Sequence, residues 1–94
     1  MNFELLSLAI KWVRIRQGIT RYRVAKDIGV QWRTFNKIEK SSRNCRVETL
    51  MLILLKLKME IAPPAVKWQG VEFSLDDKYL YHGEEKIRRT ELSG

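Results

Sequence analysis

The chain has 94 residues, 45% of them hydrophobic and 31% charged, with a formal net charge of +7, one cysteine and one histidine. This composition excludes a wholly disordered chain, and the longest apolar run, Leu50 to Leu55, is far too short to cross a bilayer. The residues present do not favour an internal disulfide, a structural zinc site or an export signal, so we expect a cytoplasmic protein without a metal or cofactor.

The first predicted element is an amphipathic helix over residues ~3–17, because apolar residues recur there at helical spacing and Gly18 follows. Thr20 is a suitable N-cap for a short second helix. The expected inner face of that helix comprises Val24, Ala25 and Ile28. Gly29 is placed to end it in the left-handed conformation that glycine tolerates best, which predicts a sharp turn into the next helix.

A third helix is predicted from about Gln31 to Lys40, with Phe35 and Ile38 facing inward. Residues 41–44 are polar and predict a loop. A fourth helix is predicted from Val47 to about Met59. These two helices complete the helical part of the chain.

The pair Pro63-Pro64 marks the expected end of the helical part, because proline neither donates a backbone hydrogen bond nor continues a helix. Beyond it, β-branched and aromatic residues partly alternate with polar ones. Gly70 and Gly83 interrupt this pattern as hairpin turns do. Two or three short strands are therefore predicted.

The positive charge is concentrated in one segment. Between Lys11 and Arg46 lie eleven basic residues but only two acidic ones, Asp27 and Glu39, which makes the segment +9 and the remainder −2. Such a region attracts a polyanion over about a Debye length, ~8 Å in physiological salt. Arginine dominates the segment and suits phosphate and base-edge geometry, although an ordinary solvated basic surface is the alternative.

Residues 10–61 carry several sequence anchors at fixed spacings: Val13-Arg14, Gly18-Ile19-Thr20, Val24-Ala25, Ile28-Gly29-Val30, Ile38-Glu39 and Val47-Glu48-Thr49-Leu50. This run resembles the repressor/Cro-type (XRE-like) helix-turn-helix family of bacterial and phage regulators. The resemblance implies a mainly α fold: a four- to five-helix repressor-like DNA-binding domain over residues 1–62. A short C-terminal β-hairpin or small sheet over residues 63–94 would then form an arm for dimerisation or partner binding.

The resemblance assigns base reading to exposed positions of the third helix, namely Trp32, Arg33, Asn36 and Lys37. Arg33 can donate two hydrogen bonds to guanine, Asn36 can pair with adenine, and Lys37 can reach a guanine or a phosphate. Trp32 departs from the family, which usually has a polar residue there. Its ring either stacks on a sugar or thymine methyl group or packs against Tyr22. The alternative for all four residues is an ordinary solvent-facing helix surface.

The resemblance also implies phosphate contacts on both sides of the third helix. The candidate residues are Arg21, Tyr22, Gln31, Thr34, Lys40, Ser42, Arg43 and Asn44. Arg21 lies at the start of the second helix, where the helix N-terminus favours anions. Arg14 is instead expected to pair internally with Glu39, as its equivalent often does in the family.

The first and fourth helices are more apolar than the motif requires, and a helix that is apolar on more than one face has to be covered. In the first helix the second apolar stripe comprises Leu5, Leu8, Trp12 and Ile15. The aromatic C-terminal strands are the obvious cover, and a second subunit is the other candidate. We expect residues 66–90, together with the fourth helix, to build a dimer interface. The predicted interface residues are Met51, Leu52, Leu55, Trp68, Val71, Phe73, Tyr79 and Tyr81. The alternative is that the C-terminal strands cover the helices within one chain.

These features predict a sequence-specific transcriptional regulator, namely a repressor of phage, plasmid or mobile-element genes that binds a palindromic operator as a homodimer. Such a protein would be associated with the nucleoid. The alternatives are an antitoxin that binds DNA and neutralises a toxin, and an adaptor that has kept the fold and lost DNA binding. RNA binding is less favoured, because no exposed aromatic sheet is evident.

No arrangement of catalytic residues is evident, so we do not expect an enzyme. Cys45 lies between Asn44 and Arg46 and is expected to be a small loop residue; the alternative is a redox-sensing thiol whose pKa the basic surroundings lower. His82 precedes Gly83 and is expected to be a turn residue.

Overall fold

The computed structural model describes residues 2–63 and 65–92. Four helices come first: α1 (Phe3–Arg16), α2 (Arg21–Ile28), α3 (Trp32–Lys40) and α4 (Val47–Leu57). Five strands follow: β1 (Met59–Ala62), β2 (Ala65–Trp68), β3 (Val71–Leu75), β4 (Tyr79–His82) and β5 (Glu85–Arg88). A short helix, α5 (Arg89–Leu92), ends the described chain.

The predicted mainly α fold class is wrong. The described chain is 51% helix and 23% strand, and its strands form one five-stranded antiparallel sheet in the order β1-β2-β3-β4-β5, which makes a mixed α/β fold. Five strands are present where two or three were predicted, and β1 lies before Pro63, in a segment that was expected to belong to the helical part. The helix ends at Leu57 because Lys58 adopts a left-handed conformation (φ 59°) that turns the chain into β1.

Pro63 consequently follows a strand and does not mark the end of the helical part, while Pro64 lies outside the described residues. Ala62 of β1 pairs with Ala65 of β2, so the expected boundary between residues 62 and 63 falls within one hairpin. Strand β1 forms one edge of the sheet.

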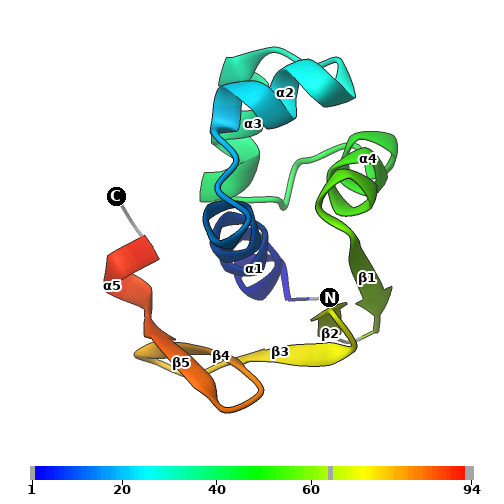
Figure 1. The fold of residues 1–94 in the computed structure, drawn as a ribbon. Coiled ribbons are helices and arrows are strands. Elements are labelled where there is room, and N and C mark those ends of the chain that lie inside the picture. The colour runs from blue at the N-terminus through cyan, green and yellow to red at the C-terminus, as the bar shows by residue number, and fades with distance from the viewer. Residues whose placement is uncertain (1, 64, 93–94) are drawn as a thin grey trace.

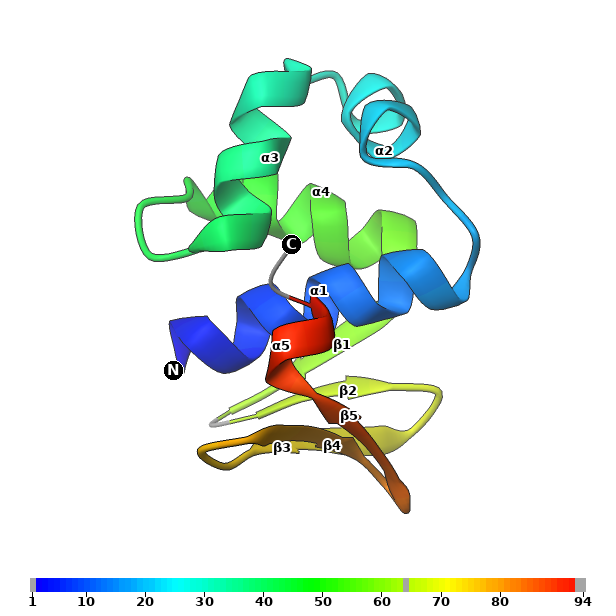
Figure 2. The ribbon, with the colours of Figure 1, turned by 90° about the vertical axis from the view of Figure 1, so that its left-hand side faces the viewer.

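Helix α1 lies between two layers of structure. Figure 1 shows α2 and α3 on one side of α1 and the sheet on the other, and Figure 2 shows the same layers after a quarter turn. The Trp12 ring packs edge-on against Trp68 and Phe73 of the sheet, with both centroid distances 5.7 Å. An ion pair between Arg89 and Glu4 joins α5 to α1. The sheet of the same chain thus covers part of the second apolar stripe of α1.

Both ends of α2 are formed as the sequence predicts. The hydroxyl of Thr20 accepts a hydrogen bond from the backbone N–H of Arg23 (3.1 Å), which confirms the N-cap of α2. Gly29 ends α2 with φ 79°, which confirms the left-handed exit. A Cβ at Gly29 would meet no atom within 4 Å, so glycine is required there for its backbone conformation and not to avoid crowding.

Short turns join the strands into a meander. Gln69 and Gly70 both have positive φ (55° and 77°) and link the paired residues Trp68 and Val71, as expected of a type I′ hairpin turn. On the outer face, Lys67 lies between Glu60 and Glu72 in a cross-strand ladder of alternating charge. Among the described residues, no helix has both the length and the apolar character needed to span a membrane.

Candidate nucleic-acid interface

Helix α3 has one buried face and one outward face. Phe35, Ile38 and Glu39 are buried, and at about 100° per residue they occupy one side of the helix. Arg33 and Lys37 are exposed on the opposite side, one turn apart. The apolar anchors therefore hold α3 in place while two cationic side chains point away from the core.

Cationic side chains without an acidic partner are concentrated on α3 and on the loop after it. Within residues 2–63 and 65–92, exposed cations that form no ion pair there include Arg33, Lys37, Lys40, Arg43 and Arg46. The arginines of α1 and α2 differ, because Arg14, Arg16, Arg21 and Arg23 all pair with carboxylates. Apart from Lys26 of α2, the exposed cations of residues 11–46 that form no ion pair with a described residue therefore lie on α3 and the loop after it.

The other two predicted base-reading residues occupy less exposed or less polar positions. Asn36 is half-buried and lines a hollow between α1 and α3 together with Lys11 and Lys40. Trp32 is 47% exposed. In the described part of the chain the Trp32 ring makes no aromatic contact, and Tyr22 is itself exposed. Trp32 therefore presents a large apolar surface at the edge of the outward face.

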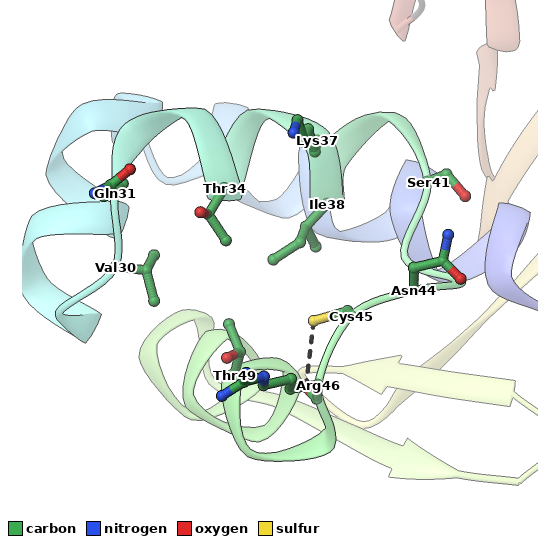
Figure 3. Close-up of a pocket in the computed structure, with 10 residues that line it drawn as sticks. All are labelled: Val30, Gln31, Thr34, Lys37, Ile38, Ser41, Asn44, Cys45, Arg46 and Thr49. Carbon is green, nitrogen blue, oxygen red and sulfur yellow. Dashed lines mark hydrogen bonds between the residues drawn. The ribbon is translucent and has the colours of Figure 1, made fainter.

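A groove of about 660 Å³ separates α3 from the start of α4 (Figure 3). Gln31, Thr34 and Lys37 line it on the α3 side, and Asn44 and Arg46 line it on the other. The side chain of Gln31 makes no capping hydrogen bond although this residue is the N-cap of α3. The groove therefore presents two amides, a hydroxyl group and two cations, which are the groups that contact a phosphate backbone.

Arg46 is a functional candidate that the sequence prediction omitted. It is exposed, forms no ion pair among the described residues and immediately precedes α4. The signal was present, because Arg46 lies two residues after Asn44 in the same basic loop. Only the fold brings it opposite Lys37 across the groove.

Ser42 does not lie on the surface, contrary to its prediction as a phosphate contact. It is 1% exposed. Its backbone N–H donates to the hydroxyl of Ser7 (2.8 Å), and its own hydroxyl donates to the carbonyl of Phe3 (3.0 Å). Ser42 therefore fixes the loop to α1 and has no hydroxyl proton left for a ligand.

Glu39 joins three helices through one carboxylate. The predicted pair with Arg14 is confirmed. Arg21 also donates to Glu39 (2.8 Å). The Nε–H group of this predicted phosphate contact is therefore already used in a hydrogen bond within the fold. Burial and the neighbouring Arg21 lower the pKa of Lys11, while Glu39 opposes that shift. Lys11, Arg14 and Arg21 thus surround the carboxylate of Glu39 in the last turn of α3.

The predicted interface residues divide into three groups by burial. Met51, Leu52 and Leu55 of α4 are exposed, as is Val71. Trp68 and Phe73 are buried against Trp12 inside their own chain and are not available to a partner, because the sheet folds back onto α1. Tyr79 and Tyr81 are half-buried on β4.

The remaining reactive side chains differ from their predicted settings. Burial raises the pKa of the Cys45 thiol, which is opposite to the shift that the redox-sensing alternative requires. His82 is the last residue of β4 and not a turn residue, and its ring stacks on Phe73 at 4.5 Å. Residues 2–63 and 65–92 contain no group of three or more His, Cys, Asp or Glu side chains placed to hold a metal ion.

Comparison of the chain with protein-family models, with curated proteins and with solved structures found no match. Function is therefore inferred from the positions and charges of the side chains described above. The likeness of residues 10–61 to repressor/Cro-type helix-turn-helix proteins stays a prediction from the sequence.

Proposed function

We propose that this protein binds double-stranded DNA sequence-specifically and represses transcription, with α3 lying in the major groove. The observation that carries the proposal is the outward face of α3, where Arg33 and Lys37 are exposed and unpaired within the described chain. The major groove is roughly 12 Å wide and admits a helix presented in this way. The buried anchors Phe35 and Ile38 support the helix from behind.

Each side chain of the proposed interface has a role set by its chemistry. Arg33 donates two hydrogen bonds to the O6 and N7 atoms of a guanine, which is worth ~1–3 kcal/mol of discrimination against another base. Lys37 reaches a neighbouring guanine or phosphate. The contacts that position the protein on the phosphate backbone come from the groove and the adjoining loop: Gln31, Thr34, Lys40, Arg43, Asn44 and Arg46.

Repression follows from occupancy of an operator that overlaps a promoter. One helix-turn-helix unit buries too little surface for tight, selective binding, so the protein acts as a homodimer on a palindromic site. The regulated genes belong to a phage, plasmid or other mobile element, and the protein is associated with the nucleoid.

The test is selection of bound sequences from random duplex DNA at several salt concentrations. The wild type should recover a palindrome, and its affinity should fall steeply with salt because phosphate contacts release counterions. Arg33→Ala should relax the preference at one base of each half-site. Arg43→Ala should weaken all sequences alike and reduce the magnitude of the log–log salt slope by about 0.9.

Arg88→Ala is the matched control, because Arg88 is exposed on β5 in the C-terminal part of the sheet. It should leave both the recovered sequence and the salt slope unchanged. Recovery of no enriched sequence would leave only a nonspecific binder. If the protein bound no duplex DNA at any salt concentration, the result would point to an adaptor that has kept the fold and lost DNA binding.

A further inference from the structure

One face of α4 is apolar and uncovered. Its inner face buries Leu50, Ile53, Leu54 and Leu57. On the outer face Met51 is 60% exposed, Leu52 44% and Leu55 76%, and Ile61 of the neighbouring strand β1 is 41% exposed. These four side chains line one open hollow of about 630 Å³ in which Glu48 is the single charged residue. Contiguous apolar surface of this kind marks an interaction site.

The sequence of this face is complementary to itself. Glu48, Met51, Leu52 and Leu55 follow the i, i+3, i+4, i+7 spacing of a helical seam. Glu48 lies in the first turn of α4, and the exposed Lys58 follows its last residue. Glu48 thus lies at one end of the row of apolar side chains, and Lys58 lies just beyond its other end.

We infer that a second copy of this chain covers the face, through antiparallel packing of the two α4 helices about a two-fold axis. With the axis at the level of Ile53, Met51 of one copy opposes Leu55 of the other, and Glu48 opposes Lys58. A two-fold interface repeats each contact, so the seam gains two acid–base pairs and two apolar pairs. This interface deepens the proposed function, because it identifies the surface through which the regulator dimerises.

The dimensions of the molecule bound the spacing of two copies. Its principal extents are 33 × 26 × 24 Å, so the centres of two copies in contact are about 24–33 Å apart, compared with ~34 Å for one turn of B-DNA. A stable interface buries ~800 Å² per partner, which exceeds what a few apolar side chains supply. The exposed Val47 and the free edge of β1 adjoin the seam and extend it.

The interface is tested by sedimentation equilibrium at micromolar concentration without DNA. The wild type should be dimeric. Leu55→Lys should raise the dimer dissociation constant about 100-fold or more, because it removes two buried leucines and brings in two cations. Val71→Lys is the matched control: Val71 is also an exposed apolar residue but lies on β3, so its substitution should leave the dissociation constant unchanged.

A charge swap separates the interface from an effect on folding. Glu48→Lys and Lys58→Glu should each weaken the dimer about tenfold, because each places like charges opposite one another. The double variant E48K/K58E should restore the wild-type constant to within about threefold. Circular dichroism of every variant should match that of the wild type.

Three outcomes would overturn the inference: a strictly monomeric wild type, a dimer that Val71→Lys disrupts while Leu55→Lys does not, or a double variant without recovery. A monomer would leave the face to an unrelated protein, such as a toxin. Failure of DNA binding is a separate result, since a wild type that dimerises but binds no DNA contradicts the proposed function alone. Leu55→Lys should still bind DNA in a salt-dependent manner through α3 and lose the preference for a palindrome.

Discussion

At the scale of single residues, Glu39 is the most constrained charge beside the proposed interface. Its side chain is 2% exposed, and both carboxylate oxygens accept hydrogen bonds from guanidinium groups. Arg14, on the other side of the pair, also donates to the carbonyl of Ile19 (2.8 Å). A buried charge is tolerated when it is paired and hydrogen-bonded in this way. Glu39 thereby fixes α3 against α1 and α2.

Glu39→Gln should therefore destabilise the fold strongly. The substitution leaves the buried guanidinium of Arg14 without a counter-charge, and loss of one partner of a buried pair costs about 3–5 kcal/mol. Urea denaturation followed by circular dichroism measures the loss. The control is Glu85→Gln in the exposed pair with Arg16, which should cost no more than about 1 kcal/mol. Equal losses in the two variants would contradict a structural role for Glu39.

At the scale of elements, the turn between β3 and β4 is built around one carboxylate. The hydroxyl of Tyr81 and the backbone N–H groups of Lys78 and Tyr79 all donate to Asp76. These hydrogen bonds, that of Tyr81 first, hold the pKa of Asp76 below its ordinary value of 3.8. The same contact raises the pKa of Tyr81. The charged form of Asp76 is thus the form that stabilises the turn.

The stability of the hairpin should accordingly depend on pH. Because the folded-state pKa of Asp76 is depressed, its contribution is fully present above the pKa of the unfolded chain and is lost as the pH falls through the folded-state pKa. Between about pH 5 and about pH 2, the urea midpoint of the wild type should fall more steeply than that of Asp76→Asn. Asparagine keeps an acceptor oxygen but does not titrate.

Asp77→Asn is the control, since the side chain of Asp77 accepts no hydrogen bond in the described structure. Its midpoint should follow the wild type over the same pH range. If Asp76→Asn had the wild-type slope, the hydrogen-bonded turn would not be the source of the pH dependence.

At the scale of the whole molecule, α1 belongs to both layers of the fold. Val13 and Ile10 are fully buried in the core cluster, and Trp12 contacts the rings of Trp68, Phe73 and His82 on the sheet. The helices and the sheet consequently share one core. Neither layer retains its apolar cover when the other is removed, so the molecule should unfold as a single cooperative unit.

Trp12→Ala should lower the free energy of unfolding by about 3–5 kcal/mol, because it opens a cavity between the layers.

Cooperativity is measured in a Trp32→Phe background, which removes the exposed indole and leaves the emission of the buried ones. In that background the helical circular dichroism and the tryptophan fluorescence should follow one urea transition. Two separate transitions would instead indicate independent units on either side of residue 62.

The sequence by itself determined the features that depend on neighbouring residues. The hydroxyl of Thr20 bonds a backbone N–H three residues away, and Gly29 adopts a backbone conformation that depends on its own missing Cβ. The bounds of α1, α2 and α3 follow from such local signals. The pairing of Arg14 with Glu39 was also predicted, though through the family resemblance and not from local chemistry.

Only the tertiary structure decided which residues are covered and which are free. Met59 to Ala62 continues the apolar pattern of α4, and four residues are too few for a strand period to show until β2 pairs with them. The burial of Ser42 depends on Ser7 and Phe3, more than thirty residues away along the chain. The sheet hides Trp68 and Phe73 and leaves the outer face of α4 open, because burial depends on contacts between distant segments that no local pattern encodes.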